Sequence, residues 1–397
     1  MRSLLFSTLY PSSARAGHGL FVETRLRKLL ETGEVDTRVV APVPWFPSTN
    51  PRFGHYAAFA RTPSAEQRHD IDVVHPRYFL PPRVGTNVAP WLLARGAWRA
   101  VCRLRAQGFD FDLIDAHYAY PDGVAAALLA RWSNRPFLVT ARGSDINLIG
   151  RYRTPAAWMR WAFSRAAACI AVSEALAARM VEQGIARRPV HVLRNGVDGG
   201  AFRPVDAALA RAELGVAGAP VLLTVGNLVP GKRQSIALEV LRDLSATHPQ
   251  ARLIVVGDGP QRPRLLAQAQ QLGIGERVDF AGAVPQARLP IYYSAADVML
   301  LPSEREGWPN VVLESLACGT PVVAARVGGV PEILSRPFLG AIIDSTASAE
   351  YARAVREVLA RAEPADKLRA YALEMGWQGT SEAQVRLFRE ALAPVRH

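Results

Sequence analysis

The chain has 397 residues, of which 49% are hydrophobic and 21% are charged, an ordinary composition for a globular protein. This length predicts about two to four domains, each large enough to bury its own core. No run of about 18 apolar residues occurs, which excludes a predicted membrane-spanning helix. The cysteines follow neither metal-binding nor redox spacing, which fits a reducing cytoplasm; they are Cys102, Cys169 and Cys318.

The positive charge is concentrated in the N-terminal half. Residues 1–190 carry 25 Lys and Arg against 14 Asp and Glu, a net charge of +11, and residues 191–397 supply the remaining +1 of the total of +12. Residues 73–109 and 146–173 contain no acidic residue and mix arginine with Trp, Tyr and Phe. This mixture suits an anionic membrane surface, although nucleic acid or ordinary solvated helices would also account for it. We favour the membrane surface and expect no nucleic-acid partner.

The first residues predict the start of a doubly wound parallel sheet. In chain order we expect a strand, a glycine-containing loop, an amphipathic helix and a second strand, over residues 3–7, 11–19, 20–32 and 37–41. The opening run resembles a signal peptide, but it is short and polar residues interrupt it, so a buried strand is favoured. The loop sequence Gly17-His18-Gly19 lacks the third glycine of a dinucleotide fingerprint and is weak evidence for NAD.

Two further strands are predicted to end in polar residues. Residues 112–116 form one strand with His117 just past its end, and residues 136–140 form another, followed by Arg142, Gly143 and Asp145. Ligands in open α/β sheets bind at these carboxyl ends, so the side chains are candidates for a site. Arg142 could bind a phosphate, and Asp145 could orient an acceptor hydroxyl or pair with Arg142. A local ion pair and a helix cap are the alternative for this pair.

Two Asp-x-Asp triplets occur, at residues 70–72 and 110–112. A triplet of this kind can bind a metal ion. Both triplets precede apolar strand residues here, so we predict that they are polar positions at strand edges. We expect no metal site.

The C-terminal half repeats the plan of strand, glycine loop and helix. Residues 190–193 read as a strand, and the turn-forming residues after it are a natural linker. Residues 221–225 form a buried strand that opens into a loop before a helix at Gln234; the loop includes Gly226, Asn227, Lys232 and Arg233. Because a helix N-terminus favours an anion, Lys232 and Arg233 are candidate phosphate ligands, with an exposed loop position as the alternative. Further strands are expected over residues 252–256, 278–280 and 298–301.

Residues 303–332 form the most informative stretch. Glu306 lies in a turn-rich loop with Gly307, and Glu314 follows eight positions later in a short helix that opens after Asn310, at Val311. A glycine, a strand and a Gly-Gly pair come next, an order typical of α/β proteins that present a phosphorylated ligand. Carboxylates cannot bind phosphate, but they accept hydrogen bonds from hydroxyls. The stretch therefore predicts a sugar on each side of a phosphate.

At these residues the chain resembles the retaining glycosyltransferases of family 4, which have the GT-B fold. The resemblance spans nearly the whole chain and is carried by Glu306-Gly307, by Glu314 and by the segment Ala317-Cys318-Gly319-Thr320-Pro321-Val322-Val323. It implies that Glu306 lies beside the donor sugar, that Glu314 holds the ribose and that Lys232 contacts the diphosphate. The family's arginine after the first glycine is Asn227 here, so that contact is missing or comes from Arg233.

The resemblance also assigns residues of the N-terminal half and completes the donor site. It implies that His117 lies beside the donor sugar and that the loop with Gly19 approaches the donor phosphates. Gly17-His18-Gly19 replaces the family's usual Gly-Gly pair. We therefore predict catalytic roles for His117, Glu306 and Lys232, and auxiliary or acceptor contacts from Arg142 and Asp145. The predicted donor contacts are Gly19, Gly226, Asn227, Lys232, Arg233, Gly307, Asn310, Val311 and Glu314.

The expected fold class is α/β, of GT-B type, with two Rossmann-like doubly wound domains facing a central cleft. The N-terminal acceptor-binding domain is predicted over residues 1–194, with a C-terminal helix in residues 376–397 packing back on it. The nucleotide-sugar domain is predicted over residues 195–375.

The expected activity is retaining, metal-independent transfer of a hexosyl group from a nucleotide-diphosphate sugar, with no cofactor. The expected acceptor is a lipid-linked saccharide or a surface polysaccharide. The expected location is cytoplasmic, with peripheral binding at the inner face of the plasma membrane. The alternatives are a nucleotide-sugar epimerase of related fold, a non-enzymatic module that binds anionic lipid, and a phosphorylase-like enzyme with pyridoxal, for which Lys232 and Lys367 are poor candidates.

Overall fold

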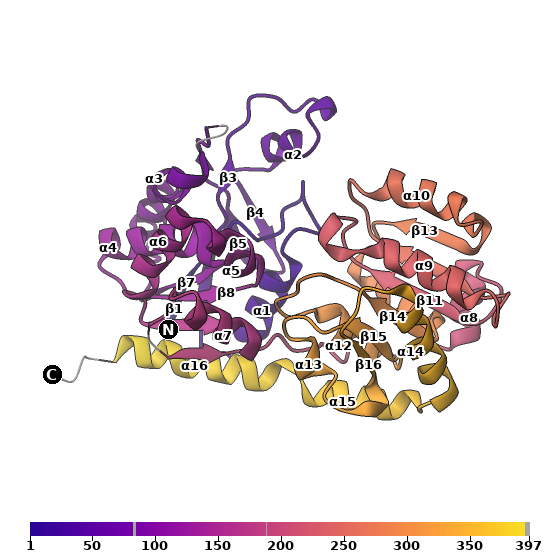
Figure 1. Ribbon diagram of the computed structural model, residues 1–397. Helices are drawn as coiled ribbons and strands as arrows, with labels where there is room; N and C mark the ends of the chain where they lie inside the picture. Colours follow the sequence, from indigo (N-terminus) through magenta and orange to yellow (C-terminus); the bar gives the residue numbers. More distant parts are fainter. Residues whose placement is uncertain (82–84, 188, 394–397) are drawn as a thin grey trace. The chain divides into compact units, whose positions relative to one another are not determined.

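The computed structural model describes residues 1–81, 85–187 and 189–393, and the chain divides into two compact units. The N-terminal unit comprises Met1–Asn195 together with the segment that begins at Trp377, and the C-terminal unit is Gly196–Gly376. Figure 1 shows both units coloured along the sequence. Their boundaries lie within one residue of the predicted domain boundaries.

The N-terminal unit is built on an eight-stranded sheet in the order β10-β9-β8-β7-β1-β2-β5-β4. All neighbouring pairs are parallel except β4 with β5. The strands are β1 (Arg2–Phe6), β2 (Asp36–Val40), β4 (Ala65–Arg68), β5 (Ile71–Val74), β7 (Leu113–His117), β8 (Phe137–Ala141), β9 (Ala168–Ala171) and β10 (Val190–Val192). A separate pair is formed by β3 (Val43–Pro44) and β6 (Arg77–Tyr78).

Helices complete the N-terminal unit, and one of them comes from the far end of the chain. The helices are α1 (Leu20–Leu30), α2 (His55–Arg61), α3 (Gly85–Ala106), α4 (Val124–Ser133), α5 (Ser144–Asn147), α6 (Arg153–Phe163), α7 (Glu174–Glu182) and α16 (Trp377–Leu392), with short turns η1 (Pro51–Phe53), η2 (Ala119–Gly123) and η3 (Ile149–Arg151). Helix α16 packs against α1, β7 and β8, and its Val385, Leu387 and Phe388 are buried in one cluster with Leu29 and Leu138.

The C-terminal unit has a six-stranded parallel sheet in the order β13-β12-β11-β14-β15-β16. The strands are β11 (Val221–Val225), β12 (Arg252–Val256), β13 (Val278–Gly282), β14 (Val298–Leu301), β15 (Val322–Ala325) and β16 (Gly340–Ile343). The helices are α8 (Ala207–Leu214), α9 (Gln234–Leu244), α10 (Arg262–Gln271), α11 (Leu289–Ala295), α12 (Asn310–Ala317), α13 (Val330–Ile333), α14 (Ser348–Arg361) and α15 (Ala365–Glu374), with turns η4 (Pro230–Lys232), η5 (Gly275–Arg277), η6 (Gln286–Arg288) and η7 (Pro337–Leu339).

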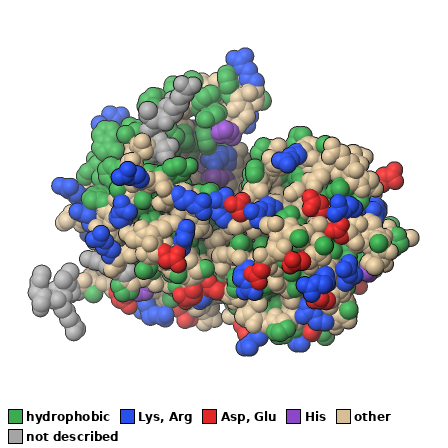
Figure 2. Space-filling model, viewed as in Figure 1, with side chains coloured by type: hydrophobic (Ala, Val, Ile, Leu, Met, Phe, Trp, Pro, Cys, Tyr) green, Lys and Arg blue, Asp and Glu red, His purple; other side chains and the backbone are tan. Residues whose placement is uncertain are grey.

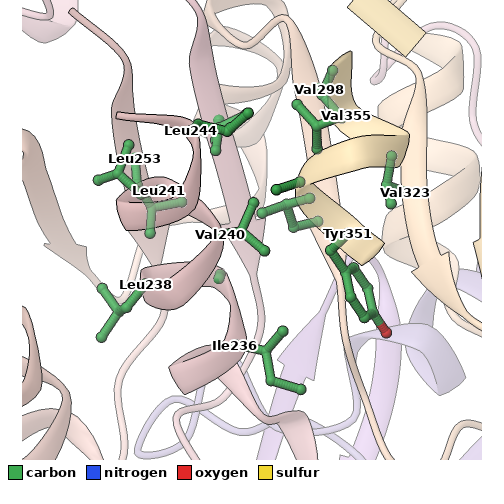
Figure 3. Packing of buried hydrophobic residues seen from close by; sticks show 14 of the residues in the cluster. Ile236, Leu238, Val240, Leu241, Leu244, Leu253, Val298, Val323, Tyr351 and Val355 are labelled. Atoms are coloured by element: carbon green, nitrogen blue, oxygen red, sulfur yellow. The ribbon is translucent and has the colours of Figure 1, made fainter. Parts of the chain in front are cut away.

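The core of the C-terminal unit lies between its sheet and two amphipathic helices. Val240 of α9 points toward α14, while Leu241 on another side of the helix lies beside the strand residue Leu253 (Figure 3). These side chains are buried because apolar residues recur at helical spacing on α9 and fill whole strands of the sheet. The strands are therefore continuous hydrophobic runs, as expected for a parallel sheet covered on both faces.

Each sheet contains one point where the order of strand addition reverses. In the N-terminal sheet β1 lies between β2 and β7, and in the C-terminal sheet β11 lies between β12 and β14. Loops that leave the strands on the two sides of such a point diverge, which opens a crevice at the carboxyl ends. The predicted doubly wound organisation is therefore confirmed for both units.

Several predicted boundaries were wrong. His117 is the last residue of β7 and not the first residue after it, since its backbone pairs with Thr140 of β8. Helix α16, Trp377–Leu392, lies within the predicted helical segment of residues 376–397 and ends before its last residues. Helix α15 was not predicted, because it buries only Leu368 and Ala372 and so has a weak apolar periodicity. Among the described residues, no helix combines the length and the apolarity needed to cross a bilayer.

Truncating a core side chain of the C-terminal unit should destabilise this unit by leaving a cavity. Leu241→Ala, at a fully buried position of α9, is expected to lower the free energy of unfolding by about 2–5 kcal/mol. The measurement is urea denaturation followed by circular dichroism. Leu266→Ala on α10, where the side chain is 41% exposed, is the matched control and should cost no more than about 0.5 kcal/mol. Equal losses in the two variants would contradict the assigned core.

Candidate functional site

Three neighbouring strands of the C-terminal sheet deliver their loops to one edge. Strands β11, β14 and β15 are adjacent and parallel, so the loops that follow them leave from the same side. These loops span residues 226–233, 302–309 and 326–329. The reversal of strand order falls between β11 and β14, so the first two loops flank the crevice. The sequence stretches with the predicted donor residues are therefore neighbours in space.

Backbone contacts fix the middle loop between the other two. The Glu304 N–H donates to the Gly231 carbonyl oxygen at 2.8 Å, and the Gly329 N–H donates to the Gly307 carbonyl oxygen at 3.0 Å. Gly328 has a positive φ of 50°, and a Cβ there would lie 2.1 Å from the carbonyl oxygen of Glu306. Only glycine allows this approach. The Gly-Gly pair therefore serves the packing of the loop that carries Glu306.

Lys232 and Glu306 meet across the crevice. The Lys232 Nζ lies 2.6 Å from Glu306 Oε1, and the two side chains are 28% and 10% exposed. The ammonium group therefore stays within reach of solvent while the carboxylate is mostly covered. The predicted phosphate ligand and the predicted sugar ligand thus form one ion pair. Such a pair can accept hydrogen bonds from hydroxyls on one side and attract a phosphate on the other.

Two helices begin beside these loops without a side-chain cap. Within the described part of the chain, the N-cap residues of α9 and α12 make no side-chain capping hydrogen bond, so the positive ends of both helix dipoles face these loops without a capping side chain. Arg233 holds the N-cap position of α9 in a left-handed conformation with φ of 49°, and its guanidinium lies 3.7 Å from Glu304. The positive end of the helix dipole favours an anion here.

Glu314 lies in the middle of α12 and is almost fully covered. Its Oε2 accepts a hydrogen bond from the Tyr293 hydroxyl of α11 at 2.8 Å. Burial raises the pKa of Glu314 to about 7, although the Tyr293 hydrogen bond lowers it. The carboxyl therefore changes charge near neutral pH, and a ligand that donates to it would favour the ionised form.

The other predicted donor residues line the same loops and helix starts. Gly226 follows β11, and a Cβ there would lie 3.9 Å from the Lys232 side chain. Asn227 is exposed, while Gly307 and Val311 are partly exposed and Asn310 is the first residue of α12. The described structure thus gathers the C-terminal candidates on one group of loops.

The N-terminal candidates are tied to one another by hydrogen bonds. His117 is 1% exposed, and its Nε2 lies 3.1 Å from Oδ2 of Asp115. Its Nδ1 contacts Nη2 of Arg142, whose Nη1 donates to Oδ1 of Asn195 at 3.1 Å. Both ring nitrogens of His117 are therefore already in use. A direct hydrogen bond from this ring to a ligand would require Arg142 to move.

Asp145 has a structural role, but not the predicted one of a helix cap, since the N-cap of α5 is Gly143 and makes no side-chain capping hydrogen bond. Its side chain is buried and accepts backbone hydrogen bonds from four N–H groups, those of Ala119, Arg142, Gly143 and Ile146. It thereby joins the loop after β8 to the loop after β7. No oxygen of Asp145 is left exposed to orient an acceptor hydroxyl.

Gly19 also has a clear packing role. It has φ of 72°, and a Cβ would lie 2.4 Å from the Leu9 carbonyl oxygen. The neighbouring His18 has its Nε2 3.1 Å from the Thr8 carbonyl oxygen, and burial lowers its pKa to about 4. The glycine therefore lets the loop fold back against the residues that follow β1.

The two Asp-x-Asp triplets lie apart from these sites. Asp72 pairs with Arg38 at 3.0 Å, and Asp110 pairs with Arg105 and Arg135. They are polar positions next to strands, as predicted. Among the described residues, no group of three His, Cys, Asp or Glu side chains is placed to hold a metal ion.

Some residues of both sites were not predicted from the sequence. They are Tyr293, the partner of Glu314, and the buried residues Asp115, Gln384 and Arg25 around His117. Asp115 could have been found, because it stands two positions before His117 on the same face of a strand. Gln384 and Arg25 lie 359 residues apart in sequence, so no local pattern relates them.

Two sequence families match the chain in succession. Residues 206–375 match the family described as "Glycosyl transferases group 1", and residues 77–199 match the one described as "Glycosyltransferase Family 4". The chain is 39% identical over 221 residues to a D-inositol 3-phosphate glycosyltransferase of Acidothermus cellulolyticus, covering 52% of this chain and 49% of the relative. The chain thus spans about half the length of the curated relatives of this name.

A second relative matches over more of its length. This is the putative teichuronic acid biosynthesis glycosyltransferase TuaC of Bacillus subtilis, at 29% identity over 345 residues, or 85% of this chain and 84% of that protein. Among solved structures, HepE of Anabaena in complex with UDP aligns with a TM-score of 0.74 at 22% identity, covering 98% of this chain and 100% of the other. This structural likeness concerns the fold. The chain belongs to the family 4 glycosyltransferases, of the group 1 type and with the GT-B fold.

Proposed function

We propose that the protein is a retaining glycosyltransferase that moves a sugar from a nucleotide-diphosphate sugar to a saccharide acceptor. The observation that carries the proposal is the Lys232–Glu306 ion pair of 2.6 Å at the reversal point of the C-terminal sheet. At this edge of the sheet, the pair combines an ammonium group that can bind a phosphate with a carboxylate that can accept hydrogen bonds from sugar hydroxyls. The crystallised relative HepE is described in complex with UDP and with UDP-glucose, which supports a nucleotide sugar as the donor.

In the proposed mechanism the C-terminal unit stabilises the departing diphosphate. Negative charge grows on this group as the bond between the anomeric carbon and the phosphate oxygen breaks. Lys232 and the positive ends of the helix dipoles at the starts of α9 and α12 stabilise that charge, which is the main electrostatic requirement. Because these groups supply the positive charge, we propose that the reaction needs no metal ion.

Retention is proposed to follow from attack on the same face of the sugar. The acceptor oxygen forms a bond to the anomeric carbon while the phosphate oxygen leaves. The leaving phosphate oxygen takes the proton of the acceptor hydroxyl, so the products are a glycoside and a nucleoside diphosphate. Glu306, which is mostly covered and already paired with Lys232, would accept hydrogen bonds from sugar hydroxyls and orient the ring.

The acceptor is proposed to be a lipid-linked saccharide or a growing surface polysaccharide. The name of TuaC assigns that protein to the biosynthesis of teichuronic acid, and the other relatives are named for a phosphorylated inositol. A basic N-terminal unit would attract either kind of anionic acceptor, since residues 1–190 carry the net charge of +11. A polymer made on a lipid carrier would also need an enzyme that stays close to the membrane.

An exposed aromatic surface on the N-terminal unit supports binding to a membrane. It consists of the large side chains Trp45, Tyr56, Phe79, Leu80 and Trp91, which are 37% to 59% exposed. Arg77 donates to the Phe59 carbonyl oxygen at 2.6 Å, so the strand end before Phe79 lies beside α2. Residues 37–65 and 73–109 contain no acidic residue. Figure 2 shows hydrophobic and basic side chains side by side on this face of the unit.

Removing the charge of Lys232 should abolish most of the transfer activity. A thermal-shift screen first identifies the donor, since a nucleotide sugar at about 100 times its Kd adds roughly 2.7 kcal/mol of stability. Lys232→Met should then lower kcat/KM by about 100-fold to 1000-fold, measured as nucleotide release with a lipid-linked saccharide extract as acceptor. The matched control Lys28→Met, at an exposed ion pair, should keep wild-type activity. Full activity of Lys232→Met would refute the proposed site, and isomerisation of the donor without acceptor would indicate an epimerase.

Donor binding should depend on pH through Glu314. Its carboxyl is protonated below about pH 7, and a ribose hydroxyl is accepted best by the ionised form. Affinity for UDP-glucose, whose diphosphate does not titrate near neutrality, should therefore fall as the pH decreases through this value. The measurement is the Kd for UDP-glucose, determined by isothermal titration calorimetry at pH values on both sides of 7. Glu314→Gln should bind more weakly and without this pH dependence; an unchanged pH profile in that variant would exclude Glu314 as its source.

The aromatic surface should determine binding to anionic vesicles. Replacing Trp45, Phe79 and Trp91 together by serine should weaken co-sedimentation with phosphatidylglycerol vesicles at low salt by more than about 10-fold, since each buried aromatic contributes about 1.5–3 kcal/mol. The matched control replaces Leu148 and Tyr152 by serine. These side chains are 41% and 66% exposed and lie in the other stretch without acidic residues, residues 146–173. If both variants bind equally, or if the wild type does not sediment, this surface is not the membrane contact.

A further inference from the structure

A buried chain of hydrogen bonds links the C-terminal helix to the polar end of β7. It runs from Arg25 of α1 through Gln384 of α16 and Asp115 to His117, and then to Arg142 after β8. All five residues belong to the N-terminal unit, and Arg25, Asp115, His117 and Gln384 are each 1% exposed. A mismatched donor or acceptor is costly in such a buried chain, so each hydrogen bond restricts the direction of the next. Three buried atoms of these residues have no hydrogen-bond partner among the described residues, namely Arg25 Nη2, Asp115 Oδ1 and Arg142 Nε.

The direction of the hydrogen bonds is fixed at both ends by arginine. A guanidinium can only donate, so the Arg25 Nε bond of 2.8 Å requires Oε1 of Gln384 as its acceptor. The amide orientation of Gln384 follows, and its Nε2 donates to Oδ2 of Asp115 at 2.7 Å. At the other end Arg142 donates to Nδ1 of His117, so this nitrogen carries no proton.

The tautomer of His117 follows from these directions. With Nδ1 as acceptor, the ring proton is on Nε2, which donates to Oδ2 of Asp115 at 3.1 Å. Burial and the nearby Arg142 lower the pKa of His117 to about 4, although Asp115 opposes this shift, so the ring is neutral. Burial would raise the pKa of Asp115, but His117, Arg25 and Arg142 lower it, and the carboxylate stays ionised. The opposite tautomer would set an N–H of the ring against the N–H groups of Arg142.

We propose that Gln384 is a positioning residue that acts through Asp115 to hold His117 in its Nε2–H tautomer and thereby aims the guanidinium of Arg142. The guanidinium is further held by Asn195 and lies over the Phe21 ring, with its central carbon 5.3 Å from the ring centroid. Arg142 is the partly exposed member of the chain and stands at the carboxyl end of the sheet. The effect of Gln384 on turnover rests on the proposed transfer reaction, whereas its effect on the tautomer does not.

Nuclear magnetic resonance of the histidine rings tests the tautomer in the full chain without any substrate. The protein has eight histidines, and His117→Gln identifies the signal of His117 in a protein labelled with ¹⁵N histidine. The wild type should show the neutral Nε2–H pattern. Gln384→Leu removes the donor to Asp115 and should shift this signal toward a mixture of tautomers. The matched control Gln378→Leu, on the exposed side of the same helix, should leave it unchanged.

Two further variants keep the test decisive if Gln384→Leu unfolds because Arg25 loses its side-chain acceptor and keeps only the Leu193 carbonyl oxygen. Arg25→Met with Gln384→Leu removes the buried charge together with its partner and should show the same shift. Gln384→Glu keeps the acceptor for Arg25 and the size of the side chain, but it sets a second carboxylate against Asp115. The groups that face this pair are the cations Arg25 and Arg142 and the neutral ring of His117. The two carboxylates should therefore share a proton that is lost as the pH rises.

Activity gives the second readout. Gln384→Leu should lower kcat by about 10-fold at every pH with a small change in the KM of the donor, because one buried hydrogen bond to a charged group is lost. Gln384→Glu should approach wild-type kcat at low pH and lose it as the pH rises. Wild-type ring signals in Gln384→Leu, or a flat pH profile in Gln384→Glu, would overturn the proposal. Failure to detect any glycosyl transfer would concern the proposed function and leave the ring signals as the deciding measurement.

Discussion

The reversal of strand order in each parallel sheet is the constraint on which the rest of the structure depends. Strands β11 and β14 are neighbours whose connections run to opposite sides, so the loops after them must diverge. This divergence lets Lys232 from one loop reach Glu306 from the other, at 2.6 Å. The same reversal between β1 and β7 brings Ser7 to the carbonyl oxygen of His117, at 2.8 Å. Within each unit, sheet topology therefore decides where the candidate groups lie.

The two units prepare their polar groups in different ways. In the C-terminal unit the ammonium of Lys232 is partly exposed, and the N-cap residues of α9 and α12 make no side-chain capping hydrogen bond, so positive charge faces the loops. In the N-terminal unit His117 and Asp145 already have protein partners for their polar atoms. The first arrangement is open to a charged ligand. The second fixes the shape of the loops and limits direct contact with a ligand to groups at the edge, such as Arg142.

Most of the fold could be predicted from the sequence because buried parallel strands are recognisable as apolar runs between glycine-containing loops. The predicted strand over residues 221–225 is β11 without any change, and the helix predicted to begin at Gln234 does so. Sequence reasoning placed Lys232 and Glu306 in loops but could not tell that they pair, because 74 residues separate them. Tyr293 and Gln384 were missed for the same reason, since their roles come only from tertiary contacts. For Asp145 the sequence suggested a helix cap, but its oxygens accept from backbone groups of the same loop and from Ala119, 26 residues earlier, which no local pattern shows.

The return of α16 to the first unit has a consequence for biosynthesis. Phe388 and Val385 fill the same cluster as Leu29 and Ile170, and Gln384 completes the pairing of the buried Arg25. During translation the first unit emerges long before these residues, and the whole second unit is made in between. Until α16 is made, the hydrophobic cluster around Leu29 and Ile170 and the side chain of Arg25 stay uncovered on the nascent chain. In this state the chain can aggregate or bind a chaperone. The ribosome must therefore finish the second unit before the first can close.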